Sequence, residues 1–575
     1  MRNLPATKTA ACTEYIVPAL PQTWEDVEPT FSALLNQPID SVADLSAWIA
    51  QRSDLDSLIS ESICWTYIHL SADSQNQQAN QRYQYAVQEL MPKLGPLDQA
   101  LNEKMVASPY LHQLDTDRYE IYLRNTLASV ALFQEDNVAL QTDVQLKTKE
   151  YARIFSQMMI GMDGKQMTLQ QANTILEEPD RKRRQNIYHK INRRILQDTT
   201  QLDLLFDELL QKRHEIARNA GMENYRDYAF QELGRFDYSP DDCHDFHQAV
   251  KSEVLPILNE LYLARKNNLK VNHLRPWDLN ADTAGQAPLQ PFKDTDELLQ
   301  KGIQCLELVN PEFGKIIQLI KRNGFLDLAS RPGKRPGGYN MPLQATRMPF
   351  VFMNATNSLG DLRTFMHESG HAIHFFLTRD FELLFDRKFT FEVAELAAMT
   401  MELLTMDHWH IFFENQEDLK RAKITQLEHV LKVLPWIATI DQFQHWLYTN
   451  PEHTQKERQA RWKESFHAFT PNILDYSGLE QYIENLWHKQ LHLFEAPFYY
   501  IEYGFAQLGA IALWRHYRNN PQEAVLAFTS AMRMGNTRSI RDIYVEAGIR
   551  FEFSQEYVRE LGAFVRGEIE ILMHG

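Results

Sequence analysis

The chain has 575 residues, 44% of them hydrophobic, and this length predicts a large core divided between two or three lobes. Its 59 Lys and Arg residues against 76 Asp and Glu residues give a net charge of -17, which argues against broad binding to nucleic acid or anionic lipid. Small or peptidic partners fit this charge better.

The N-terminal run 1–29 lacks the uninterrupted apolar core of a signal peptide, because prolines and acidic residues break it. No later segment approaches the roughly 20 apolar residues of a membrane span. The cysteines form neither a CxxC pair nor an obvious disulfide framework; they are Cys12, Cys64, Cys243 and Cys305. We therefore expect a cytoplasmic protein with no membrane or nucleic-acid partner. Its oligomeric state is not predicted, although a monomer is compatible with the sequence.

Most of the chain predicts α-helix, because long stretches without Gly or Pro carry apolar residues at three- and four-residue spacing. Residues 44–70 and 198–221 are examples, and Gly221 is expected to end the second. Pro and Gly exclude continuous helix from residues 266–293 and 328–349. The fold class predicted is mostly α.

A short apolar strand is predicted at residues 350–354, "FVFMN", directly after the second of these interruptions. We expect its edge to pair with an extended substrate. Asn357, Ser358 or Asp361 then provides the N-cap of a helix. The order predicted is strand, turn and a helix that carries "TFMHESGHAIHFF" (364–376).

His367 and His371 are four residues apart on this helix, so both imidazoles can point at one metal ion. Two neutral nitrogen ligands at this spacing suit zinc. Glu368, one position further round, is placed to remove a proton from a zinc-bound water, which is the task of a general base. His374 lies on nearly the same face, and we assign it a packing or supporting role.

A catalytic zinc usually has three protein ligands and one open position. A third histidine at the spacing H-E-x-x-H-x-x-G-x-x-H would fall on Leu377, which excludes that class. The next predicted helix, 389–404, offers Glu392, Glu395 and Glu402. Periodicity alone does not choose among these three carboxylates.

The segments "HESGHAIH" (367–374) and "ELAAMTMELL" (395–404) together resemble the oligoendopeptidase F and thimet oligopeptidase family of zinc peptidases. This resemblance implies one Zn2+ per chain, held by His367, His371 and Glu395. It implies that Glu402 is a supporting carboxylate and that Glu392 lies outside the metal centre.

The resemblance extends to "GKRPGGY" (333–339) and to "HLFEAPFYYIEYGFAQLGA" (492–510). The second segment implies that His492, Tyr499 and Tyr503 donate hydrogen bonds to the reacting carbonyl. The chain has Ala506 where some members carry a further tyrosine, so the donor set is expected to be smaller.

The resemblance covers the chain from about residue 190 to its end. It implies an N-terminal helical region at 1–189 and a catalytic region at 190–575. The implied fold has two helical lobes around a deep channel, with a small β element beside the zinc helix. Such a channel admits short unfolded peptides and excludes folded proteins.

We therefore predict a zinc-dependent endopeptidase that hydrolyses internal bonds of oligopeptides. One alternative is a zinc carboxypeptidase or dipeptidase of a related helical fold, which needs a cationic group for the substrate's terminal carboxylate; no Lys or Arg can be given that task from the sequence. Another is an inactive peptide-binding scaffold. Glu368 argues against the scaffold, because a site released from catalysis has no need of a general base.

Overall fold

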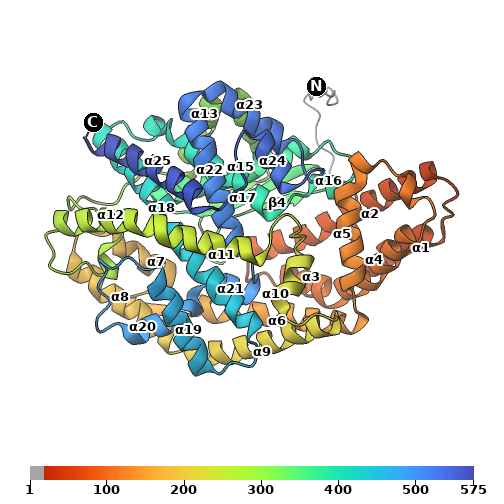
Figure 1. Ribbon diagram of the computed structural model, residues 1–575, viewed down its shortest axis with the longest axis horizontal. Helices are drawn as coiled ribbons and strands as arrows, with labels where there is room; N and C mark the ends of the chain where they lie inside the picture. Colours follow the sequence, from red (N-terminus) through yellow and green to blue (C-terminus); the bar gives the residue numbers. More distant parts are fainter. Residues whose placement is uncertain (1–17, 575) are drawn as a thin grey trace.

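The computed structural model describes residues 18–574, and helices dominate it (Figure 1). Cys12 and residues 1–17 of the run used to exclude a signal peptide lie outside the described residues. The prediction of a mostly α fold with a small β element beside the histidine helix is confirmed. Within residues 18–574, no helix combines the length and the apolarity needed to span a bilayer.

The first helices form one end of the molecule, drawn in red and orange at the right of Figure 1, and have a hydrophobic core of their own. This core includes Phe31 and Trp48 and also Leu383 from much later in the chain. The helix predicted at 44–70 is confirmed within α2. The helices are α1 (Trp24–Asn36), α2 (Val42–Ala72), α3 (Gln77–Tyr85), α4 (Met91–Val106) and α5 (Thr116–Leu132).

The next segment runs along the lower part of Figure 1 and then returns through its centre. The helix predicted at 198–221 is confirmed as α9, and Gly221 follows it with a φ of 75°, a conformation that glycine adopts without strain. The elements are α6 (Glu135–Ser156), the hairpin β1 (Met159–Met162) and β2 (Lys165–Thr168), α7 (Leu169–Thr174), α8 (Arg181–Leu196), α9 (Thr199–Asn219), α10 (Tyr225–Glu232), α11 (Pro240–Ala249) and α12 (Leu255–Asn268).

The remaining helices form the upper part of Figure 1 and part of its lower edge. At the centre, α17 packs along both α15 and α22. They are α13 (Thr295–Val309), α14 (Pro311–Arg322), α15 (Leu359–Thr378), α16 (Leu384–Arg387), α17 (Phe391–Met406), α18 (Gln416–Thr449), α19 (Gln455–Ala468), α20 (Glu480–Glu484), α21 (Leu491–Glu495), α22 (Tyr500–Asn519), α23 (Pro521–Met532), α24 (Ile540–Glu546) and α25 (Gln555–His574). The channel implied between the lobes stays a prediction.

A three-stranded sheet of β3 (Leu326–Ala329), β4 (Tyr339–Leu343) and β5 (Met348–Ala355) lies beside α15. The predicted strand 350–354 is confirmed as part of β5. Its predicted role as a free edge is wrong, because the strand order is β3-β5-β4 and both sides of β5 are paired. The Pro- and Gly-rich stretch before it does exclude helix, but part of it forms the edge strand β4.

Helix α2 holds this sheet from the N-terminal end of the molecule. The carboxylate of Glu61 is fully buried and accepts hydrogen bonds from the backbone N–H groups of Ala345, at 2.8 Å, and Thr346, at 2.6 Å. Both donors lie in the turn between β4 and β5. The backbone N–H of Arg335 also donates to the Ser71 carbonyl at 2.8 Å. Hydrogen bonds to a carboxylate are stronger than neutral ones, so α2 fixes the position of the turn.

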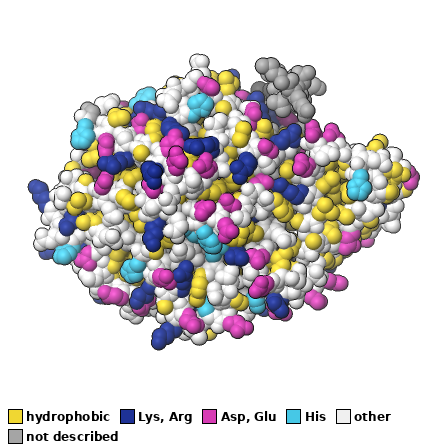
Figure 2. Space-filling view, viewed as in Figure 1, with side chains coloured by type: hydrophobic (Ala, Val, Ile, Leu, Met, Phe, Trp, Pro, Cys, Tyr) yellow, Lys and Arg dark blue, Asp and Glu magenta, His cyan; other side chains and the backbone are white. Residues whose placement is uncertain are grey.

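On the face drawn in Figure 2, acidic and basic side chains are interspersed. No broad area of this face carries Lys and Arg alone. This arrangement agrees with a net charge of -17, which disfavours an extended polyanion as a partner.

Candidate metal centre

His367 and His371 project from α15 toward one point. Ser358 is the N-cap of this helix, and its hydroxyl accepts from the backbone N–H of Asp361 in a capping box. The centroids of the two imidazole rings are 4.8 Å apart, and their planes are nearly perpendicular. Both side chains keep some solvent access, 19% for His367 and 16% for His371. A small ion can therefore reach them.

Glu395 on α17 brings a carboxylate to the same point. Its Oε2 atom lies 3.3 Å from His367 Nε2 and 3.8 Å from His371 Nε2. The three ligand atoms lie within 4.8 Å of one another. Glu395 Oε2 is buried and makes no hydrogen bond within the described part of the chain. A buried oxygen of this kind needs a partner, and two imidazoles with one carboxylate are a donor set that suits zinc. The residues fit the ion that the resemblance implies.

The surroundings keep His371 and Glu395 deprotonated, as metal ligands must be, but favour a proton on His367. Burial lowers the pKa of His371 to about 4, so this ring is neutral at pH 7. Burial opposes the charge on Glu395, but His371 and His367 outweigh it and lower the pKa to about 2. Burial also opposes a proton on His367, yet Glu395 and Glu402 outweigh it and raise this pKa. A metal ion must therefore displace the proton of His367.

We expect zinc affinity to fall as the pH is lowered through the neutral range, because a proton competes with the ion at His367, whose pKa Glu395 and Glu402 raise. Competition against a chelating dye, corrected for the dye's own protonation at each pH, measures this fall. An affinity that does not change with pH would contradict the displacement of a proton from His367.

Gly370 sets the distance between the two helices of the centre. A Cβ atom at this position would lie 2.6 Å from both the carbonyl oxygen of Ala397 and the Cα atom of Ala398 on α17. Backbone atoms cannot yield as a flexible side chain does, so only glycine permits this approach. The close contact brings Glu395 within reach of the histidines.

Replacing Gly370 with Ala is expected to lower the free energy of unfolding by about 1–3 kcal/mol, as overpacking does, and to weaken zinc binding by separating α15 from α17. Gly360→Ala is the matched control, because the nearest atom to a Cβ there is Ser358 Oγ at 3.4 Å. Chemical denaturation and a zinc titration of both variants measure the effects. Equal behaviour of the two variants would show that the helices tolerate the extra methyl group.

Glu402 supports His367 from behind. Its Oε1 atom accepts a hydrogen bond from His367 Nδ1 at 2.8 Å, which leaves Nε2 directed toward Glu395. Gln426 on α18 donates from Nε2 to the other oxygen of Glu402 at 3.0 Å. Sequence reasoning missed Gln426, because no motif links it to the histidine helix. Its burial within α18, which the structure shows, is what identifies it.

His374 and Glu392 lie outside the group of metal ligands. His374 is fully buried and stacks on Phe389, with ring centroids 3.8 Å apart. Burial lowers its pKa to about 3, so the ring is neutral. Glu392 instead accepts a hydrogen bond from the hydroxyl of Tyr238 at 2.6 Å and lies 3.9 Å from Arg235.

Glu368 lies beside the three ligands, 5% exposed, with its Oε2 atom unbonded within the described chain. Burial raises the pKa of this carboxyl to about 7. Gly338 of the glycine-rich stretch comes close to it: a Cβ atom there would lie 3.4 Å from Glu368 Oε1. The stretch thus borders the carboxylate predicted to be the general base.

The structure also brings His492, Tyr499 and Tyr503 together. The three ring centroids are 5.3–5.8 Å apart in pairs. The hydroxyl of Tyr499 donates to Glu395 Oε1 at 2.8 Å, so this tyrosine is joined directly to a predicted metal ligand. The side chain of Ala506 is fully buried on the next turns of α22.

Gln490, which sequence reasoning missed, orients His492. Its side-chain nitrogen lies 2.7 Å from His492 Nδ1. An amide nitrogen only donates, so Nδ1 accepts and the proton of the neutral ring is on Nε2. Burial lowers the pKa of His492 to about 4, which keeps the ring neutral at pH 7. His492 Nε2 is therefore a hydrogen-bond donor. In the sequence, only its position two residues before His492 could have pointed to Gln490.

The sequence profile of peptidase family M3 matches residues 174–563, and that of the peptidase M3 N-terminal domain matches residues 18–133. Oligopeptidase PepF of Bacillus subtilis is 22% identical over 344 residues, which are 59% of this chain and 48% of the relative. An oligoendopeptidase F homologue of Borreliella burgdorferi is 24% identical over 298 residues, 50% of this chain and 48% of the relative. The chain thus matches about half the length of these curated relatives.

Among solved structures, Pz peptidase A with an inhibitor has the same fold, with a TM-score of 0.91 and 24% identity over 96% of this chain and 98% of that one. These matches confirm the resemblance to oligoendopeptidase F. Because the M3 profile covers more than half of the chain, including α15, α17 and α22, the chain belongs to peptidase family M3.

Proposed function

We propose that the chain is a zinc-dependent endopeptidase that hydrolyses internal bonds of short unfolded peptides. His367, His371 and Glu395 would hold one catalytic Zn2+ per chain. The observation that carries the proposal is the position of Glu368, a buried carboxyl with an unbonded oxygen, beside three converging ligand atoms. A metal site that only stabilised the fold would not need this carboxyl.

When bound, the zinc would polarise the scissile carbonyl and lower the pKa of the attacking water. Glu368 accepts the proton of that water and returns it to the leaving amine. Its pKa of about 7 suits both directions of transfer at neutral pH.

Tyr503 and His492 are proposed to stabilise the negative charge that develops on the carbonyl oxygen. His492 offers Nε2–H, as its contact with Gln490 implies. Tyr499 joins this group, but its hydroxyl already donates to Glu395, so it also fixes that ligand. Hydrogen-bond donors that are already in position lower the barrier most when the charge that they stabilise is present only in the transition state.

An extended substrate is proposed to pair with β4, in place of the role predicted for β5. This strand is at an edge of the sheet, and it begins directly after Gly338, which borders Glu368. A peptide paired there would run past the carboxylate that moves the proton.

We also propose that the chain divides into an N-terminal helical region at 1–189 and a catalytic region at 190–575, and that the protein is cytoplasmic.

Replacing Tyr503 with Phe is expected to lower kcat by roughly 10²-fold to 10³-fold with little change in KM, because one donor to the developing charge is lost. Tyr517→Phe on the same helix is the control: it removes a hydroxyl that lies 2.9 Å from His408 Nε2. Steady-state kinetics of both zinc-loaded variants measure the difference. A kcat within about threefold of the parent for Tyr503→Phe would remove this hydroxyl from the mechanism.

A digest of a mixed peptide library, with cleaved bonds mapped by mass spectrometry, tests the proposed function. Internal cuts that stop on chelation and return with zinc support it. Cuts only at peptide ends would favour the carboxypeptidase or dipeptidase. The absence of any cut would favour the inactive scaffold.

A further inference from the structure

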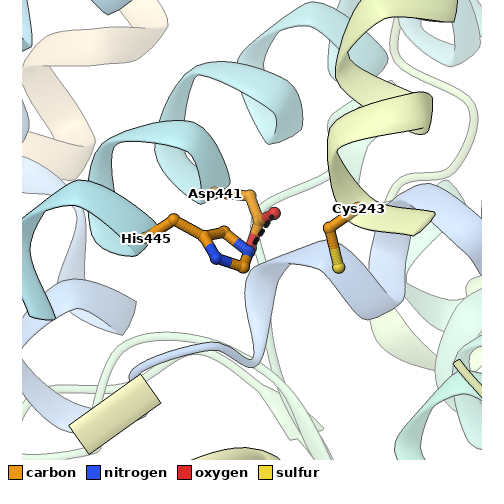
Figure 3. A group of neighbouring side chains, drawn as sticks. All are labelled: Cys243, Asp441 and His445. Carbon is orange, nitrogen blue, oxygen red and sulfur yellow. Dashed lines mark ion pairs between the residues drawn. The ribbon is translucent and has the colours of Figure 1, made fainter. Parts of the chain in front are cut away.

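A second group of metal-ligating side chains lies outside the candidate metal centre. Helix α11 contributes Cys243, and α18 contributes Asp441 and His445, one turn apart (Figure 3). Their ligand atoms lie within 4.8 Å of one another, and all three residues are buried. The burial excludes a catalytic Cys–His–Asp arrangement, because a substrate cannot reach the thiol.

Among the described residues, no Lys or Arg forms an ion pair with Asp441. The ion pairs of Asp441 are with histidines, His247 Nε2 at 2.8 Å and His445 Nε2 at 3.3 Å. Neither ring nitrogen of His445 makes a hydrogen bond within residues 18–574. A metal ion bound between this carboxylate and the imidazole would give the ring nitrogen the partner that it lacks.

We propose that Cys243 Sγ, Asp441 Oδ2 and His445 Nε2 form a second site, for a divalent transition metal such as zinc. Sulfur, nitrogen and oxygen together favour such an ion over calcium or magnesium. On binding, the thiol proton of Cys243 passes to solvent and a sulfur–metal bond replaces the S–H bond. The metal must displace this proton, because only the thiolate binds it.

The neighbours of Asp441 have the arrangement expected around a ligand. His247 lies against Oδ2, and Gln444 donates from Nε2 to Oδ1 at 2.9 Å, so both carboxylate oxygens are held in place. His244 lies between His445 and the surface: its ring centroid is 5.1 Å from that of His445, and its side chain is half exposed.

The side-chain amide of Gln444 links the second site to the segment that carries Tyr499. Gln444 Oε1 accepts a hydrogen bond from the backbone N–H of Phe498 at 2.7 Å. Phe498 has a φ of 66°, which is uncommon for a residue with a large side chain, and it directly precedes Tyr499. An ion on Asp441 would thus stabilise the turn from which Tyr499 reaches Glu395.

Cobalt(II) substitution of the full-length chain tests the second site. A cysteine ligand gives a thiolate-to-cobalt charge-transfer band in the near ultraviolet, and the candidate metal centre contains no cysteine. We expect this band in the parent chain and in a variant that carries both His367→Ala and His371→Ala. In that variant about one cobalt per chain should remain.

Cys243→Ser should remove the band and one metal equivalent, whereas Cys305→Ser should keep both. Cys305 is the matched control, since it is a buried free cysteine whose thiol donates to the His408 carbonyl. No band in the parent would overturn the proposal whether or not the variants fold. A band that survives Cys243→Ser would also overturn it, because the thiolate would then come from another cysteine. Neither result depends on peptidase activity.

Discussion

Replacing Glu368 with Gln is expected to lower kcat by roughly 10²-fold to 10⁴-fold while the zinc content stays at that of the parent. The amide fills the same space but cannot accept the proton of the attacking water. Since Glu368 Oε2 makes no hydrogen bond within the described residues, the substitution breaks no contact of that atom. Turnover of an internally quenched peptide and metal analysis of the same sample measure the two quantities.

Glu392→Gln is the matched control for this result. It is the same change of a buried carboxyl near the site, and the amide oxygen can still accept from Tyr238. We expect its kcat to stay within about threefold of the parent. A zinc-loaded Glu368→Gln protein with nearly normal kcat would show that another group moves the proton.

Replacing Glu395 with Ala is expected to weaken zinc binding by more than about 10²-fold, because one of three ligands is removed. Glu402→Gln should cost less, about 10-fold to 100-fold, since it alters a partner of His367 Nδ1 and of Gln426 but removes no ligand. Competition with a chelating dye at a fixed pH measures both affinities. Glu392→Ala should keep the zinc. If Glu392→Ala lost the metal and Glu395→Ala kept it, the assignment of the third ligand would be wrong.

The choice of the third ligand shows where periodicity stops. The spacing within one helix brings His367 and His371 to the same face, and their ring contact has that geometry. Which glutamate of α17 faces them depends on how α17 is rotated against α15. The contact of Gly370 with Ala397 and Ala398 sets this rotation, and a contact between two helices is not encoded in the period of either.

The sheet shows a second limit. The apolar run of β5 was recognisable, because a central strand is buried on both sides. The preceding stretch contains Pro and Gly, which indicate the absence of helix but not the presence of a strand. Pro342 lies in the edge strand β4, where a missing N–H is tolerated. Strand pairing, and with it the free edge, therefore appeared only in the structure.

No sequence motif indicates the cluster of Cys243, Asp441 and His445. Cys243 forms no CxxC pair, and it is about two hundred positions from Asp441 and His445. Only the packing of α11 against α18 joins them. Gln426 was missed for the same reason, since it meets Glu402 only through the packing of α18 against α17. Gln490 is two residues from His492, but no motif marks an amide at that spacing as a partner of histidine.

The buried carboxylate of Glu61 bears on whether the chain can be divided. The two profile matches are separate in sequence, yet Glu61 from the first holds the β4–β5 turn of the second. A protein made of residues 190–575 alone would leave two backbone N–H groups of that turn without their acceptor, at the far end of the strand that follows Gly338. The two segments should therefore unfold in a single transition, and a protease cut between them should leave fragments that remain associated.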